Sequence, residues 1–394
     1  MADPYSKQYL MTPGPTPLPP AVSQVMAEPM LYHRAPAFVE VYARALARLR
    51  PVFGTGGDVL LFGSSGTGAM ESAVANLVGP GDAGLVASCG KFGERWAELC
   101  EAYGAETVHH DFGWGNKVDP AGVDRLLEEN PDAKVLFTTL SETSTGVLND
   151  VRTLAEVAHS HGALIAVDAI SAVGAVPVCQ DDWGLDVVVG GSQKALMSPP
   201  GLGFASPNEA ALAHAAARPG RRYYFDWQRT LDGQRKDPPD SAFTPPVGLV
   251  QALDVALGLI EDEGIESVFE RHRVLGDAAR AAARNLDLEL FGPEDEKANV
   301  CTAITLPDGI DGAKLPSTMR KRYGVTIAGG QGELKGRICR IAHCGYFGAF
   351  DIVVAVGALE MALSDLGHEV EFGAGVSAAQ RVFRDAGVSV AASA

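Results

Sequence analysis

Leu185-Asp186-Val187-Val188-Val189-Gly190-Gly191-Ser192-Gln193-Lys194-Ala195-Leu196 reads as a mostly apolar strand that runs directly into a lysine. A lysine placed where a buried strand ends is unusual, because its amine is then partly removed from water. Such an amine loses its proton more easily and can attack a carbonyl carbon. The segment therefore predicts a reactive lysine, Lys194, at the carboxyl end of a buried strand.

A carboxylate follows a second strand of the same kind. Ala163-Leu164-Ile165-Ala166-Val167 is apolar throughout and is followed by Asp168. Taken alone, Asp168 could cap a helix that begins at Ser171, and Lys194 could be a surface lysine. Together they suit pyridoxal 5'-phosphate (PLP), because its aldehyde needs a lysine for a Schiff base and its ring nitrogen needs an acidic partner. We therefore take Asp168 and Lys194 as the candidate catalytic residues.

Strands alternate with helices through the first half of the chain. Short apolar runs predict strands at residues 58–62, 84–88, 107–109, 134–139, 163–167 and 185–189. Helices are predicted between them at residues 69–78, 93–103, 120–129 and 151–161. This alternation is typical of βαβ units, so we expect an α/β fold with a mostly parallel sheet. Ligands of such sheets bind at the carboxyl ends of the strands, where Asp168 and Lys194 fall.

The flanks of this region have other patterns. Five prolines between Pro13 and Pro20 exclude a helix there and favour an extended arm. Residues 218–247 look irregular, and a long helix over 247–286 is expected to break near Gly264.

The last third of the chain predicts a smaller domain. Strands are expected at 299–306 and 337–343, and helices at 314–323 and 350–366, which together indicate an α+β unit. We expect an extended arm over residues 1–20, a large PLP-binding domain over 21–270, the small domain over 271–372 and a tail over 373–394.

A glycine-rich turn lies between a predicted strand and a predicted helix. Its sequence is Gly63-Ser64-Ser65-Gly66-Thr67-Gly68. A turn of this kind at a helix N-terminus offers free N–H groups and the positive end of the helix dipole to a phosphate. By itself it could be a plain strand-to-helix connection, since it matches neither GxGxxG nor a P-loop. With the two catalytic candidates downstream, we expect this turn to bind the phosphate of the cofactor.

Three further places have side chains suited to the cofactor or the substrate. The hydroxyls of Ser141-Glu142-Thr143-Ser144-Thr145-Gly146 could donate to the ring oxygen of PLP, or the segment could be an ordinary turn. Phe92, after another predicted strand, could stack on the ring or belong to the core. Arg340 could bind a substrate carboxylate or face solvent, since a guanidinium is the natural fork for a carboxylate.

Composition and charge argue against several classes of partner. The chain has 394 residues, a net charge of −17 and a pI of about 4.9, which argue against nucleic acid and anionic membrane surfaces. The six cysteines form no CxxC pair and no zinc spacing, so we expect reduced thiols and no metal. The sequence shows no signal-peptide pattern at its start and no apolar run of about 18 residues, so we expect a cytoplasmic protein.

Taken together, the motifs resemble the class V aminotransferases of PLP fold type I, in particular the alanine/serine–glyoxylate (serine–pyruvate) aminotransferase group. The most specific motif is Gly191-Ser192-Gln193-Lys194-Ala195-Leu196 followed by Pro199-Pro200-Gly201. Supporting motifs lie at residues 13–16, 65–71, 142–147, 167–168 and 339–343, and the resemblance covers residues 8–370. It implies a large domain with a mostly parallel seven-stranded sheet sandwiched by helices, plus a smaller α+β C-terminal domain.

The resemblance also implies roles for residues at matching positions. Lys194 would carry the Schiff base, Asp168 would pair with the pyridine nitrogen, and Thr143 would contact the ring hydroxyl. The resemblance implies further cofactor contacts from Ser65, Gly66, Thr67, Phe92 and Gln193, and substrate contacts from Arg340 and Gly14.

A position near residue 244 implies an assembly. Thr244 matches a residue that reaches the phosphate of a neighbouring subunit, which implies a homodimer with shared active sites. Ser241 stands where such proteins often have a tyrosine, so a second contact across the subunits is not expected from that position.

The activity that the resemblance implies is transfer of an amino group from a small amino acid, such as serine or alanine, to glyoxylate or pyruvate. Ureidoglycine and aspartate are alternative amino donors within similar sequences. A cysteine desulfurase or related lyase is another alternative, but those enzymes usually carry His before the lysine, and this chain has Gln193. A non-catalytic protein that kept the fold would be expected to lack Lys194 or Asp168, and both are present.

Overall fold

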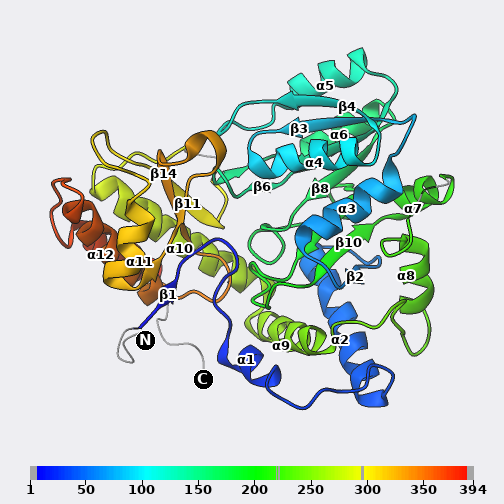
Figure 1. Ribbon diagram of the computed structural model, residues 1–394, viewed down its shortest axis with the longest axis horizontal. Coiled ribbons are helices and arrows are strands. Elements are labelled where there is room, and N and C mark those ends of the chain that lie inside the picture. Colours follow the sequence, from blue (N-terminus) through cyan, green and yellow to red (C-terminus); the bar gives the residue numbers. More distant parts are fainter. Residues whose placement is uncertain (1–6, 219, 221, 294–296, 388–394) are drawn as a thin grey trace.

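A seven-stranded sheet forms the centre of the larger part of the molecule (Figure 1). The computed structural model describes residues 7–387 except 219, 221 and 294–296, so the outer ends of the expected arm and tail lie outside the described residues. The strands follow the order β2 (Leu60–Phe62), β10 (Gly203–Pro207), β9 (Val187–Gly191), β8 (Leu164–Asp168), β5 (Ala133–Thr139), β3 (Ala83–Ser88) and β4 (Glu106–Asp111). Strand β10 runs antiparallel to both of its neighbours, and all other neighbouring pairs are parallel. The predicted α/β class with a mostly parallel sheet is therefore confirmed.

Helices cover both faces of the sheet, because successive residues of its strands point to opposite sides. On β9, Val188 packs into one hydrophobic cluster, whereas Val187 and Val189 pack into another. The Val188 side is covered by α2 (Pro36–Phe53), α5 (Pro120–Glu129), α6 (Val151–Ser160) and α9 (Val247–Glu263). The other side is covered by α3 (Gly66–Leu77), α4 (Lys91–Ala102), α7 (Glu209–Ala216) and α8 (Trp227–Gln234).

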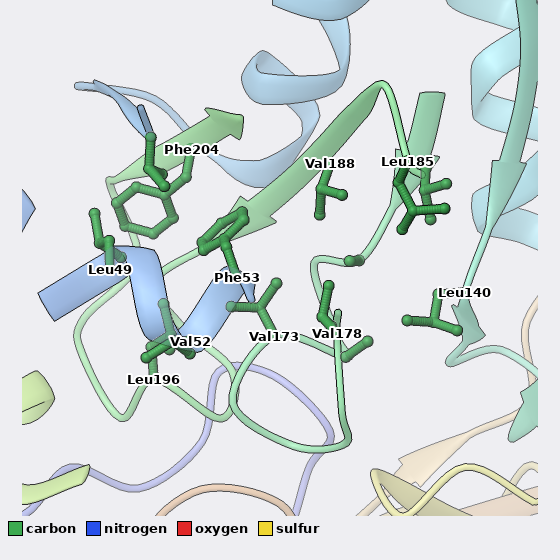
Figure 2. Packing of buried hydrophobic residues seen from close by; sticks show 14 of the residues in the cluster. Leu49, Val52, Phe53, Leu140, Val173, Val178, Leu185, Val188, Leu196 and Phe204 are labelled. Atoms are coloured by element: carbon green, nitrogen blue, oxygen red, sulfur yellow. The ribbon is translucent and has the colours of Figure 1, made fainter. Parts of the chain in front are cut away.

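The segment that follows Lys194 is anchored in the cluster on the Val188 side. Figure 2 shows Leu196 beside Val52 of α2, with Phe53 directed toward Phe204 of β10. The two phenylalanine rings meet edge to face, with their centroids 6.3 Å apart. Leu196 is fully buried, so hydrophobic packing holds the backbone only two residues after Lys194.

A second body lies beside the large sheet, on the left in Figure 1. Its sheet has the order β11 (Cys301–Thr305), β14 (Ile338–Ala342) and β13 (Ala328–Gly329), and all neighbours are antiparallel. Four helices belong to its hydrophobic cluster: α10 (Ile265–Asn285), α11 (Leu315–Tyr323), α12 (Ala349–Asp365) and α13 (Ala374–Asp385). Val268 packs in the hydrophobic cluster on the Val188 side of the large sheet and Val274 in the cluster of the second body, so α10 passes from one to the other.

The N-terminal arm joins the two bodies. Its short strand β1 (Tyr9–Leu10) pairs in parallel with β12 (Val325–Thr326) of the small body, and Met11 packs in the small-domain cluster. After the extended stretch the chain enters α1 (Pro20–Val25).

One region agrees with the expected pattern, and another differs from it. The predicted break of the long helix is confirmed, because Gly264, with φ of +82°, separates α9 from α10. The prediction of irregular structure over 218–247 is wrong for Trp227–Gln234, which forms α8 behind an Asp226 cap. In the tail, Ala374–Asp385 forms the helix α13.

Candidate active site

Lys194 lies in a closed loop at the end of β9. The hydroxyl of Ser192 donates to the carbonyl of Pro199 at 2.6 Å, and this tightens the turn around the lysine. The lysine side chain is buried, and its Nζ donates to the carbonyl oxygen of Pro13 at 2.7 Å. The hydroxyl of Thr16 donates to the carbonyl of Lys194 at 2.8 Å, so the N-terminal arm is attached directly to the lysine.

Asp168 ends the neighbouring strand, β8. It is 4% exposed, and its Oδ1 accepts the backbone N–H of Ile170 at 2.8 Å. Burial raises the pKa of Asp168 from 3.8 to about 7, and the Ile170 N–H and the nearby Lys194 offset only part of that effect. The carboxyl group is therefore only partly ionised near neutral pH, and a cationic partner would stabilise its charged form.

Burial acts on Lys194 in the opposite sense. It lowers the pKa of the amine, because the charged form loses its hydration. An amine that becomes neutral more readily is a better nucleophile and a better proton acceptor. Burial thus favours the neutral form of both Lys194 and Asp168. Shifted pKa values of this kind are common in catalytic sites.

The N-terminus of α3 lies beside Asp168 and Lys194, at the same cavity. Ser65 is the N-cap residue, and its side chain makes no capping hydrogen bond within the part of the chain that the structure describes. The first-turn N–H groups, those of Gly66 and Thr67 among them, are therefore open to an anion. Arg95 of α4 adds a positive charge beside them, because its Nη1 donates to Oγ1 of Thr67 at 3.2 Å.

These elements surround one cavity of about 260 Å³. Nine of the residues predicted from the sequence line it: Gly14, Ser65, Gly66, Thr67, Phe92, Thr143, Asp168, Gln193 and Lys194. Arg95, Ser141, Ile170, Ser171 and Pro200 are among its other walls. The cavity lies at the carboxyl ends of the parallel strands, where the alternation of strands and helices predicts a ligand site.

The aromatic and hydroxyl side chains lie on the walls near the lysine. The centroid of the Phe92 ring is 5.8 Å from Nζ of Lys194. The guanidinium carbon of Arg95, on the same helix as Phe92, is 5.1 Å from that centroid. The hydroxyl of Thr143 hydrogen-bonds to the hydroxyl of Ser171. The side chains thus form an apolar face and a hydroxyl-bearing wall, both of which suit a flat ring with polar substituents.

Two predicted residues do not line the cavity. Arg340 is buried on β14, where its guanidinium donates to the carbonyls of Thr143 at 2.6 Å and of Gly329 at 2.8 Å. It therefore bridges the small and large domains close to the cavity wall. Thr244 lines a separate hollow with Tyr224 and other residues near Gly63.

Two polar wall residues, Arg95 and Ser171, were not predicted from the sequence, although the sequence contains a signal for each. Arg95 follows Phe92 by three residues at the start of a helix, so both project on the same side. Ser171 follows Asp168 by three residues in the turn after β8, a place that we considered only as a helix start. In both cases a position three residues after a predicted site residue indicates a second side chain at the same site.

The walls fit PLP. Two buried polar atoms on them, Oε1 of Gln193 and Oγ of Ser141, have no hydrogen-bond partner in the described part of the chain. Buried polar atoms without partners are uncommon, and here they face a cavity that a polar ligand would fill. Lys194 would hold the aldehyde of PLP, Asp168 its ring nitrogen and the N-terminus of α3 its phosphate, and each of these side chains or amides has the chemistry that the group requires.

Comparison with known proteins identifies the family of the chain. Residues 8–340 match the family described as Aminotransferase class-V. The chain belongs to the class V aminotransferases. It is therefore a PLP-dependent aminotransferase of fold type I, and the predicted family, fold and cofactor are confirmed.

Relatives of this aminotransferase carry different names. A protein named serine–glyoxylate aminotransferase from Methylorubrum extorquens is 34% identical, and the alignment covers 96% of each chain. A protein named soluble hydrogenase, small subunit, from a Synechococcus strain is 41% identical over 96% of this chain and 99% of the relative. The crystal structure of a ureidoglycine–glyoxylate aminotransferase from Bacillus subtilis has a TM-score of 0.92 and 29% identity, with 98% of this chain and 100% of that chain covered.

The described residues of this aminotransferase also bear on metals and membranes. Among them, no three His, Cys, Asp or Glu side chains are grouped so that they could hold a metal ion. None of the helices in the described part of the chain combines the length and the apolar composition that crossing a membrane requires.

A substitution at Gly14 tests the contact between the arm and the lysine. A Cβ atom added there would lie 2.5 Å from Cδ and Nζ of Lys194, and the backbone φ of +143° also disfavours other residues. Gly14→Ala is therefore expected to displace the arm and lower kcat/KM of the aminotransferase by about tenfold or more. Gly81→Ala is the control, because that glycine also has a positive φ, of +89°, but its added Cβ meets open space. Steady-state kinetics that fall equally in both variants would contradict the steric account.

Proposed function

We propose that this enzyme carries PLP on Lys194 and moves an amino group from a small amino acid to glyoxylate or pyruvate. One observation supports this most: Lys194 and Asp168 are buried in a single cavity, beside the uncapped N-terminus of α3. That combination supplies a covalent anchor, a partner for a ring nitrogen and a phosphate cradle in one place.

Each wall of the cavity would then have a role in holding PLP. Asp168 would accept a hydrogen bond from the ring N–H, Phe92 would lie on the ring face, and Thr143 would donate to the ring oxygen. We assign the phosphate contacts to Ser65, Gly66, Thr67 and Gln193.

Lys194 would also move a proton during the reaction. When bound, PLP supplies an aldehyde that takes up amino groups and a ring that accepts the negative charge formed at the substrate α-carbon. Nζ of Lys194, once released by the incoming amine, would take the α-proton and later deliver it. The lowered pKa of Lys194 supports this role, because the amine must be neutral to accept a proton. Gly14 and Arg340 would contact the substrate, and the guanidinium of Arg340 would bind the substrate carboxylate. That contact requires the guanidinium to exchange the carbonyls of Thr143 and Gly329 for the substrate.

The names of the relatives indicate the substrate class. Serine, alanine, aspartate, ureidoglycine and pyridoxamine are the amino donors named among them, and glyoxylate and pyruvate are the acceptors. We propose the same acceptors here, with serine or alanine as donor, because the cavity of about 260 Å³ must hold the cofactor and the substrate together. The test is to add single amino acids to the PLP-loaded enzyme and follow loss of its visible absorbance, then to restore that absorbance with single 2-oxo acids. An enzyme that responds to no amino acid in this screen would contradict the proposal.

Cysteine chemistry supports a transaminase over a desulfurase. Cys339 lies in β14 and Cys344 follows the end of that strand by two residues. Both thiols are buried, and burial raises the pKa of each to about 12. Thiols of this kind are poor nucleophiles, whereas a desulfurase needs a reactive one. All six cysteines are free thiols, which also supports our proposal of a cytoplasmic location.

We further propose a homodimer in which Thr244 binds the cofactor phosphate of the partner subunit. In one subunit Thr244 lines a hollow separate from its own cavity, together with Ser241 and exposed Tyr224. Thr244→Ala is expected to raise the Kd for PLP by about tenfold, the effect of losing one hydrogen bond to a charged group. Ser241→Ala, in the same hollow, is expected to change the Kd less. Sedimentation of the loaded enzyme measures the assembly, and a monomer with unchanged affinity in the Thr244 variant would contradict both parts.

A further inference from the structure

A buried carboxylate outside the cavity connects two of its walls. Glu142 ends the short strand β6 (Ser141–Glu142) and is fully buried, yet it is not one of the cavity-lining residues. Its Oε2 accepts the backbone N–H groups of Phe92 at 3.1 Å and Gly93 at 3.0 Å. Its Oε1 accepts the backbone N–H of Ser144 at 3.1 Å and the hydroxyl of Ser144 at 2.5 Å.

These contacts favour the ionised carboxylate. All four partners are donors, so a proton on either oxygen would displace one of them. The N–H groups of Phe92 and Gly93 belong to the first turn of α4, where the helix dipole also favours a negative charge. Burial raises the pKa of Glu142, but the four hydrogen bonds act against that effect. Each of the two carboxylate oxygens accepts two of these hydrogen bonds.

The side chains of Glu142 and Ser144 lie close to the backbone at the start of α4, where Gly90 leaves room for them. A Cβ atom on Gly90, at the N-cap of α4, would lie 2.6 Å from both Cγ of Glu142 and Oγ of Ser144. The same Ser144 hydroxyl accepts the N–H of Lys91 at 3.1 Å. The start of α4 and the segment around residue 143 are thus joined through a short, largely buried hydrogen-bond network.

The two joined segments carry different walls of the cavity. Phe92 lies on the α4 side and faces Lys194, while Thr143 lies between Glu142 and Ser144 on the other side. A shift of either segment would change the spacing between the aromatic face and the hydroxyl wall. Small displacements of this kind are costly in sites that bind a rigid ring.

We propose that Glu142 is a positioning residue, whose carboxylate fixes Phe92 and Thr143 at the separation that PLP requires. The proposal rests on the assignment of those two residues to the cofactor. It assigns to Glu142 an indirect role, through hydrogen bonds to the backbone, and no contact with PLP or substrate.

The test is Glu142→Gln, which keeps the shape but places an amide where the carboxylate accepts from four donors. The amide NH₂ must then face two donors, so hydrogen bonds to one segment are lost. The Kd of the cofactor-free protein for PLP is expected to rise about tenfold or more, and the amides of Phe92 and Gly93 are expected to exchange with solvent faster. The circular dichroism of the bound cofactor is expected to weaken, since its surroundings are less ordered.

Glu360 offers a matched control in the small domain. Its carboxylate is also buried and also holds a helix start, because it accepts the N–H groups of Gly373 at 2.8 Å, Gly375 at 2.9 Å and Val376 at 3.2 Å. Glu360→Gln is expected to lower the Tm without changing the Kd for PLP. A Glu142 variant with wild-type PLP affinity and wild-type amide exchange would overturn the proposal.

A second variant keeps the test decisive if Glu142→Gln does not fold. Ser144→Ala removes the hydroxyl donor but leaves the three backbone donors of Glu142 in place. It is expected to raise the Kd for PLP by a smaller factor and to speed exchange of the Lys91 amide. An unchanged Kd in this variant would also count against the proposal. Failure of the wild-type protein itself to take up PLP would instead contradict the proposed function, so the two failures are distinct.

Discussion

Lys194→Ala is expected to abolish covalent attachment of PLP and to lower kcat by about a thousandfold or more. The variant loses both the anchor of the cofactor and the only proton acceptor that we assign at the substrate α-carbon. Residual PLP binding through the phosphate cradle is expected, because the N-terminus of α3 and Asp168 are unchanged. Borohydride reduction followed by peptide mapping measures the attachment directly, and the label is expected on the peptide that contains Lys194 in the wild-type protein alone.

Lys134→Ala is the matched control for that experiment. Lys134 is exposed near the start of β5, at the opposite end of the sheet from the cavity, and its Nζ donates to the nearby carbonyl of Pro131. Label, visible absorbance and kcat are expected to stay at the wild-type level. A Lys194 variant that kept full turnover, or a wild-type label on another lysine, would refute the assignment of the anchor.

The positions of Lys194 and Asp168 could be predicted because they follow from a general property of parallel sheets. Apolar runs of five residues indicate buried strands, and polar residues that follow them must meet at one edge of the sheet. The structure places Lys194 and Asp168 at the ends of the adjacent strands β9 and β8. Local pattern and topology were enough to bring them together.

Other parts of the site depend on contacts that a sequence pattern does not encode. The sequence predicts Arg340 as an arginine suited to a carboxylate, but its guanidinium is held by the carbonyls of Gly329 on the neighbouring strand and of Thr143, which is 197 residues away in the chain. The role of Glu142 depends in the same way on the N–H groups of α4, some fifty residues away in the chain. Buried polar groups find partners wherever the fold provides them, so their neighbours appear only in three dimensions.

The helix α8 was missed for a local reason. Its eight residues contain only two large apolar side chains, Trp227 and Leu231, so the helical repeat is too weak to stand out. The informative residue was Asp226, which caps the helix by accepting the N–H of Arg229 at 3.0 Å. Burial of Trp227 against α3 then stabilises a segment whose own helical signal is small.

Asp168→Asn is expected to lower kcat/KM by about a hundredfold to a thousandfold, as for the loss of one electrostatic stabiliser in an active site. Asparagine can still accept the N–H of Ile170, so the backbone of the turn is retained. It cannot balance a positive charge on the ring nitrogen of PLP, and the ring then accepts electrons less readily. The loss is expected mainly in kcat, because the phosphate cradle and Lys194 still bind the cofactor.

The same substitution is expected to stabilise the cofactor-free protein above neutral pH. Burial raises the pKa of Asp168 from 3.8 to about 7, so between these values the folded protein holds a proton that the unfolded chain has lost. The free energy of unfolding therefore falls as the pH rises through this window, by up to about 4 kcal/mol from this group. The asparagine side chain has no charge to bury, so the variant is expected to have the higher Tm at pH 8 and the same Tm as the wild type near pH 4.

Asp186→Asn separates this effect from a general loss of a buried carboxylate. Asp186 is buried at the opposite end of β9, where it accepts from Nε2 of His159 at 2.8 Å and from the N–H of Ile165 at 2.9 Å. An amide there faces donors, so this variant is expected to be destabilised at pH 8 with PLP binding retained. Thermal unfolding of the three cofactor-free proteins at pH 4 and pH 8 gives the comparison. If the difference in Tm between the wild type and the Asp168 variant is the same at pH 4 and pH 8, this carboxyl group ionises normally. The cavity would then lack the electrostatic penalty that a cationic ring nitrogen relieves.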